Sequence, residues 1–283
     1  MFSSASSQRA WVDASSLEPG ATTANGTPIR KQSAVGLVLL AAYTFFISDA
    51  ALAEDFFHDG KAREIKIDSR IAPDTTIGGY ALFHADNNWQ LQSMVVDGPT
   101  SMGVRYGTVQ LYRPLDRKYF ADLIVTTNLD QSSRSFFLLN DYCSGPHLVK
   151  VDKVMSGGGE GTRDNCMTID PLVLTVGSRQ VNVISINIRN AQAGSRLYHM
   201  RLRIDPTALG VTQALPANLN DRAYTENPAL RVFVDRLAAW ARQLQDATNI
   251  AIQYSKPANA FAAIPSWWDL KGDYDALPKV NSP

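Results

Sequence analysis

Short runs of alternating apolar and polar residues fill most of the chain between residues 63 and 204. Alternation of this kind is the period of a strand, whose successive side chains point to opposite faces. Turn residues separate the runs. We expect about ten short strands, at residues 63–68, 79–84, 89–96, 102–112, 119–127, 136–139, 147–154, 172–176, 181–189 and 198–204. Since no helical period intervenes, the pattern predicts a mainly β fold with an antiparallel β-sandwich or barrel-like body.

The last two runs carry the strongest hairpin signal. Residues 181–189 are rich in β-forming side chains, and residues 191–194 supply a turn that ends in Gly194. In the run that follows, apolar residues alternate with a basic ladder made of His199, Arg201 and Arg203. The ladder is expected on the wet face of an antiparallel sheet. There it either attracts an anionic polymer, a lipid or an acidic partner, or is a solvated face paired with carboxylates.

The period changes after a polar connector at residues 207–226. Asn227 is a favourable N-cap and Pro228 is tolerated at the first helical position. Apolar residues then recur every three or four positions, at Leu230, Phe233, Leu237, Trp240, Leu244, Ala247, Ala251 and Tyr254. The spacing predicts a long amphipathic helix over residues 227–256, packed on the β body. Its near-heptad spacing also fits a partner-binding helix. An irregular tail at residues 257–283 follows.

The segment at residues 30–53 has the features of a secretory signal peptide. Arg30 and Lys31 precede an apolar run at residues 34–47, and Ala51-Leu52-Ala53 is an A-x-A cleavage pattern. As a helix the run would span about 21 Å, short of the roughly 30 Å of a hydrocarbon core. The alternative is an uncleaved membrane anchor. Residues 1–29 have a disordered composition and form an unusual leader, and a β-rich domain is expected over residues 54–206.

The chain has two cysteines, Cys143 and Cys166, and export would place them in an oxidising compartment. In an oxidising compartment they are expected to form a disulfide rather than a catalytic or metal-binding pair. A thiolate–imidazole pair of Cys143 with His147 is disfavoured, because a Gly-Pro turn separates them. The enclosed glycine run lacks the GK[ST] ending of a phosphate loop. We interpret it as a mobile candidate contact loop comprising Gly157, Gly158, Gly159, Glu160, Gly161 and Arg163.

The net charge and the absence of known motifs argue against several classes of function. The chain has 27 basic and 27 acidic side chains, so its formal net charge is zero, and nucleic-acid binding is not expected. The histidines form no HxxxH or HExxH pattern, and there is no GxSxG motif. We therefore expect no catalytic, metal or cofactor site, and the sequence carries no signal for an oligomeric state.

These observations favour an exported bacterial-type envelope protein, periplasmic or secreted. The first hypothesis is a non-enzymatic binding or structural module whose partner is a protein or an envelope polymer. One alternative is a hydrolase acting on a glycan or another polymer of the envelope through paired carboxylates. Another is a single-span membrane-anchored subunit of an envelope complex, which requires that residues 34–47 are retained.

Overall fold

The structure, a computed structural model, describes residues 55–72, 74–83, 88–100, 103–115, 118–130, 143–157, 161–192, 196–254 and 260–274. The predicted leader, the signal segment and the strand at residues 136–139 lie outside these residues. The strands are β1 (Phe57–His58), β2 (Lys61–Ala62), β3 (Thr76–Ile77), β4 (Tyr80–Ala81), β5 (Gln90–Asp97), β6 (Tyr106–Leu115), β7 (Lys118–Asn128), β8 (Val149–Gly157), β9 (Gly161–Val176), β10 (Arg179–Gln192) and β11 (Arg196–Ile204). The helices are η1 (Pro206–Leu209), α1 (Ala223–Glu226), α2 (Pro228–Tyr254) and η3 (Trp267–Leu270).

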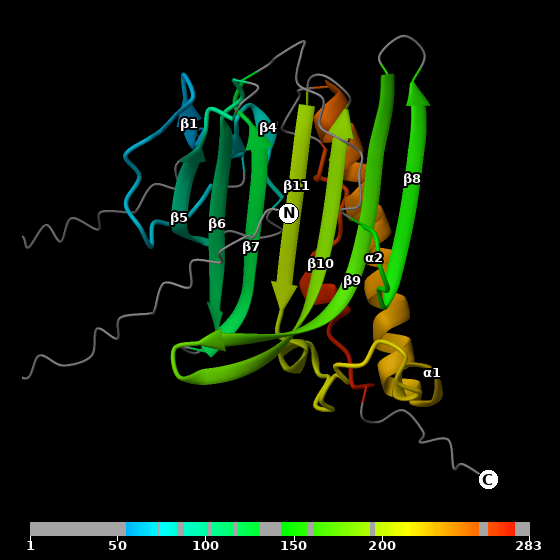
Figure 1. The fold of residues 1–283 in the computed structure, drawn as a ribbon. Helices are drawn as coiled ribbons and strands as arrows, with labels where there is room; N and C mark the ends of the chain where they lie inside the picture. The colour runs from blue at the N-terminus through cyan, green and yellow to red at the C-terminus, as the bar shows by residue number, and fades with distance from the viewer. Residues whose placement is uncertain are drawn as a thin grey trace, which may run out of the picture. The chain divides into compact units, whose positions relative to one another are not determined.

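One antiparallel sheet of seven strands dominates the fold, in the order β5-β6-β7-β11-β10-β9-β8 (Figure 1). After β7 the chain crosses to the far edge, and β8 to β11 return strand by strand until β11 pairs with β7. The mainly β prediction is confirmed. The predicted sandwich or barrel shape is not confirmed. The other described strands form only two-stranded sheets, β1-β2 and β3-β4.

The predicted hairpin is β10-β11, and its register fixes the two faces of the sheet. Arg189 pairs with His199 and Asn187 with Arg201. The alternation along β11 divides its side chains as predicted: those of Tyr198, Met200, Leu202 and Ile204 are fully buried on one face. We call that face the inner face and the opposite one, which carries the basic ladder, the outer face.

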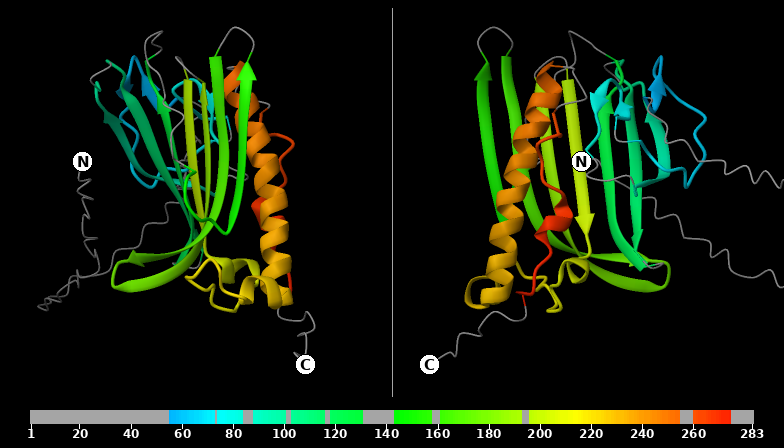
Figure 2. Two further views of the ribbon diagram at one scale, coloured as in Figure 1. Left: turned by 45° about the vertical axis from the view of Figure 1, so that its right-hand side comes forward. Right: turned by 180° about the vertical axis from the view of Figure 1, so that it is seen from behind.

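Helix α2 covers the inner face, as the apolar stripe predicts (Figure 2). Asn227 is its N-cap, because its Oδ1 accepts hydrogen bonds from the backbone N–H groups of Ala229 at 2.9 Å and Leu230 at 3.2 Å. The stripe residues from Leu230 to Ala251 are buried. At the other end, Arg196 Nη1 donates to the carbonyl oxygen of Ile252 at 2.5 Å, where a cation complements the helix dipole.

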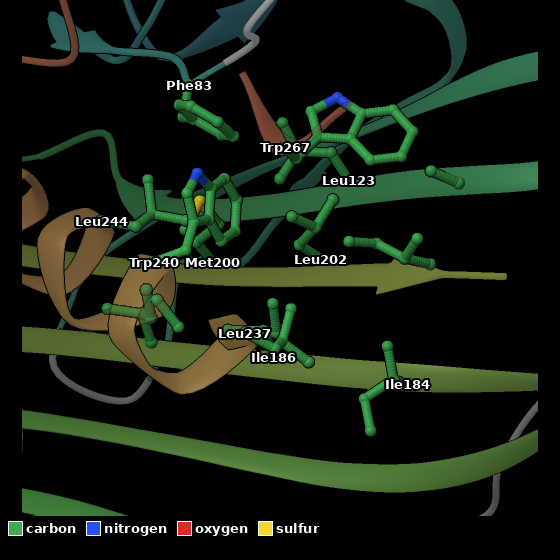
Figure 3. Close-up of a cluster of buried hydrophobic side chains, with 14 of the residues drawn as sticks. Phe83, Leu123, Ile184, Ile186, Met200, Leu202, Leu237, Trp240, Leu244 and Trp267 are labelled. Carbon is green, nitrogen blue, oxygen red and sulfur yellow. The ribbon is translucent and has the colours of Figure 1, made fainter. Parts of the chain in front are cut away.

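The core lies between α2 and the inner face, as Figure 3 shows. Leu237, Trp240 and Leu244 of the helix face Ile186 and Met200 of the sheet. Residues before β5 and after α2 also pack in this layer. The centroids of the Phe83 and Trp240 rings lie 5.8 Å apart, and Trp267 is fully buried. Burying one aliphatic or aromatic side chain stabilises a fold by roughly 1.5–3 kcal/mol. Since α2 buries several such side chains against the sheet, it contributes to the stability of the core.

Three expected strands differ in the structure. In the segment predicted as a strand at residues 79–84, only Tyr80–Ala81 forms one. Residues 63–68 form no strand, although Ile65 and Ile67 alternate; Ile67 is 47% exposed, so the alternation does not mark a buried face. Strand β9 is far longer than residues 172–176, since polar residues at its start hid it from the pattern. Pairing on both sides, with β8 and β10, stabilises this polar start.

Candidate functional site on the outer face

Three arginines gather on the outer face of the central strands. Arg201 and Arg203 of β11 point there with His199, and Arg189 of β10 lies directly across from His199. Because side chains of paired residues stand about 5 Å apart and alternate residues share a face, these four side chains form one cluster. We call it the basic cluster.

Arg203 is held by a buried carboxylate. Its Nε donates to Asp122 Oδ1 at 2.6 Å, and its Nη2 donates to Asp122 Oδ2. Gln110 Nε2 donates to the same Asp122 Oδ2 at 3.3 Å. The Asp122 side chain is only 4% exposed and that of Arg203 15%. This bidentate pair neutralises the charge of Arg203 and fixes its guanidinium on the sheet.

Arg201 is oriented by a neutral group. Its Nε donates to Asn187 Oδ1 at 2.9 Å, and Asn187 Nδ2 donates to Thr168 Oγ1 at 3.3 Å and to Ser185 Oγ at 3.4 Å. Thr168 and Ser185 are buried beneath the longer side chains. The Asn187 amide therefore orients the guanidinium of Arg201 on the sheet.

The environment of His199 lowers the pKa of its imidazole. Burial, and then the positive charges of Arg201 and Arg189, lower the pKa of its imidazole to about 3. The ring is therefore neutral at pH 7, and the basic cluster owes its charge to arginine. His199 therefore lies on this face without contributing to its charge.

The disulfide lies at the same face. Cys143 and Cys166 are bonded, with their Cα atoms 6.3 Å apart, and Cys166 pairs with Arg189 across β9 and β10. His147 does not serve the sulfur: its Nδ1 lies 2.8 Å from Asp170 Oδ2. The backbone N–H of Leu148 donates to Asp170 Oδ1 at 3.2 Å. The bridge and the Asp170 contacts together pin the segment before β8 to the outer face.

The described residues of the candidate contact loop, Gly157, Gly161 and Arg163, lie at the tip of the β8-β9 hairpin. Gly157 and Gly161 form the last residue pair of β8 and β9, and Arg163 pairs with Met155 on one side and Gln192 on the other. Gly158, Gly159 and Glu160 lie outside the described residues. The disulfide thus encloses a paired hairpin, and the structure does not bring this tip together with the basic cluster.

Two members of the outer face were missed by sequence reasoning. Arg189 could have been predicted from the sequence, because pairing of the two strands of the expected hairpin places it opposite His199. Asp122 had none, because the pairing of β7 with β11 joins residues far apart in the chain. Within the described ranges, no group of three or more His, Cys, Asp or Glu side chains is placed to hold a metal ion.

A buried polar cluster on the inner face was also missed. Asn165 and Asn190 face Gln245 and Thr248 of α2, and all four are almost fully buried. Asn190 Nδ2 donates to Thr248 Oγ1, and Gln245 Nε2 donates to the Asn165 carbonyl at 3.3 Å. Four amide atoms, Asn165 Nδ2, Asn165 Oδ1, Asn190 Oδ1 and Gln245 Oε1, have no hydrogen-bond partner among the described residues. Their desolvation makes this end of the helix interface less stable than the apolar end.

Comparison of the chain with protein-family models, with curated proteins and with solved structures finds no match. The disulfide fits a protein that resides outside the cytoplasm, where thiols are oxidised. Among the described residues, no helix has the length and apolar character needed to cross a membrane.

Proposed function

We propose that the protein is an exported, non-enzymatic binding module, periplasmic or secreted, and that its outer face binds an anionic polymer of the cell envelope. The observation that carries the proposal is the basic cluster, in which Asn187 orients the Arg201 guanidinium and Arg189 lies on the neighbouring strand of the same face. Preorganised arginines suit carboxylate, phosphate and sulfate groups, because their planar forks bind such groups in a bidentate manner.

The export part of the proposal rests on two features. Arg30, Lys31, the apolar run at residues 34–47 and the A-x-A pattern form the signal, and the disulfide suits the destination. N-terminal sequencing of the protein recovered from the envelope tests this part. A start at Glu54 is expected, whereas an intact residue 34–47 segment would favour the membrane-anchored subunit.

The non-enzymatic part rests on the separation of two outer-face carboxylates whose side chains the structure describes. Asp122 on β7 and Asp170 on β9 lie in the same row of the outer face, with β11 and β10 between them. Three strand spacings of about 4.8 Å place their backbones about 14 Å apart, beyond the roughly 5–9.5 Å of glycosidase pairs. Each also has its own partner, Arg203 or His147. This arrangement disfavours a glycan hydrolase on this face.

Binding is tested with residues 54–283, using heparin as the anionic probe and dextran as the neutral one. We expect heparin to bind with an affinity that falls as salt rises, and dextran not to bind. The double variant Arg189→Gln, Arg201→Gln should weaken heparin binding at least several-fold. The matched control, Arg231→Gln with Arg242→Gln, removes the same charge from exposed positions on α2. Equal loss in both double variants, or no binding by the unchanged protein, would overturn the proposal.

A further inference from the structure

A two-stranded arm projects from the large sheet. β9 pairs with β8 only up to Ile169, and β10 pairs with β11 only from Ile184 onward. Beyond these points, Leu172–Val176 and Arg179–Val183 pair only with each other and join through Gly177 and Ser178. Figures 1 and 2 show that these ends of β9 and β10 curve away from β8 and cross below the end of β11. We call the segment at residues 172–183 the arm.

Most residues of the arm are exposed, on both of its faces, although Val183 at its base is fully buried. Leu172 and Val173 are consecutive residues of a strand, so their side chains point to opposite faces. They are 41% and 49% exposed. Thr175, Gln180 and Asn182 are exposed as well. These side chains lie on strands that extend beyond the sheet, where a free edge can pair with another chain.

The edge of β9 in the arm presents unpaired backbone groups. Pro171 pairs with Ile184 in the ladder but has no N–H, so its backbone must face away from β10. The ladder continues without a bulge, so Val173 and Thr175 also direct their N–H and C=O groups outward. Within the described part of the chain, no backbone hydrogen bond reaches this edge.

The sequence of this edge suits pairing with itself. Leu172-Val173-Leu174-Thr175-Val176 contains β-formers and no charge. The lysines, bulges and prolines that protect exposed edges are absent from these five residues. Two copies can therefore approach in antiparallel orientation without like-charge repulsion. The other edge carries Arg179, which would weigh against self-pairing there.

We propose that two copies of this chain form a symmetric dimer by antiparallel pairing of the β9 edges of their arms. In the symmetric register centred on Leu174, Val173 exchanges both backbone hydrogen bonds with Thr175 of the partner subunit. Leu174 lies opposite Leu174 of the partner subunit. The two arms then form a four-stranded sheet in which Leu172, Leu174 and Val176 of both copies lie on the same face. This dimer is independent of anion binding by the basic cluster.

The molar mass of residues 54–283 in solution tests the proposal, measured by light scattering from micromolar to millimolar concentration. We expect twice the chain mass at the upper end. Val173→Lys with Thr175→Lys places lysines opposite each other across the interface and should leave a monomer with unchanged thermal unfolding. The matched control, Gln180→Lys with Asn182→Lys, adds the same charge to paired positions on the β10 edge. It should remain a dimer.

A cysteine at the centre of the interface tests the register. Since Cys143 and Cys166 are bonded to each other, Leu174→Cys adds a single thiol and should give a covalent dimer on mild oxidation. Val181→Cys, at the position paired with Leu174 in the same arm, should not. A protein that is monomeric at every concentration would overturn the proposal. So would a dimer that survives the Val173 and Thr175 lysines, or one that only the β10-edge lysines dissociate.

Discussion

Removing the disulfide tests how the outer face is held together. Cys143 and Cys166 are 23 residues apart in sequence and both are buried. In the chain-entropy model, a crosslink that closes a loop of this length stabilises the fold by about 3 kcal/mol. The double variant Cys143→Ala, Cys166→Ala should lose about that much free energy of unfolding. A protein of this size has a urea m-value near the upper end of about 1–3 kcal/mol/M, so the midpoint should fall by roughly 1 M.

The assay is urea unfolding of residues 54–283, followed by circular dichroism with and without reductant. Reductant should shift the midpoint of the unchanged protein to that of the double variant, and it should not affect the variant. Equal midpoints for the oxidised and reduced proteins would refute the reasoning. That result would mean that β8-β9 pairing and the Asp170 contacts hold the segment without help from the bridge.

Three further predictions concern buried polar and aromatic groups. Asp122→Ala leaves the charge of Arg203 without its buried carboxylate and should cost about 3–5 kcal/mol in urea unfolding, whereas Asp122→Leu with Arg203→Met should recover most of it. His199 titrates near pH 3 when folded and near 6.5 when unfolded, so stability should fall as pH drops below 6.5, by at most about 1.4 kcal/mol per unit. His199→Gln should flatten this dependence, and parallel pH curves would contradict the burial of the ring. Trp267→Ala should cost about 3–5 kcal/mol, and unchanged thermal unfolding would show that the tail does not pack.

Local periodicity was sufficient for the helix and the last hairpin. Asn227 caps α2 where the sequence indicated, and the residues of β11 alternate between the faces as expected. These features depend on side chains close together in the chain. The large single sheet, in contrast, depends on β11 inserting beside β7. Nothing in the alternation of either strand specifies that neighbour, because one amphipathic strand suits many partners.

The candidate site was predictable only in part, for the same reason. His199, Arg201 and Arg203 share a face because they alternate along one strand. Asp122, which neutralises Arg203, comes from a strand some eighty residues earlier, and the buried amides Asn165 and Gln245 meet across the helix–sheet interface. Long-range contacts of this kind carry no local signal. The projecting arm was not predicted either, because alternation identifies its residues as strands without showing that the two strands extend beyond the sheet.

The measurement that tests the proposed function most directly is an NMR titration with heparin. The Nε–Hε signals of the arginines would be followed in residues 54–283. We predict that the signals of Arg189 and Arg201 shift together as heparin is added, while those of Arg231 and Arg242 on α2 stay in place. Shifts confined to the α2 arginines, or no shift at all, would contradict binding at the outer face.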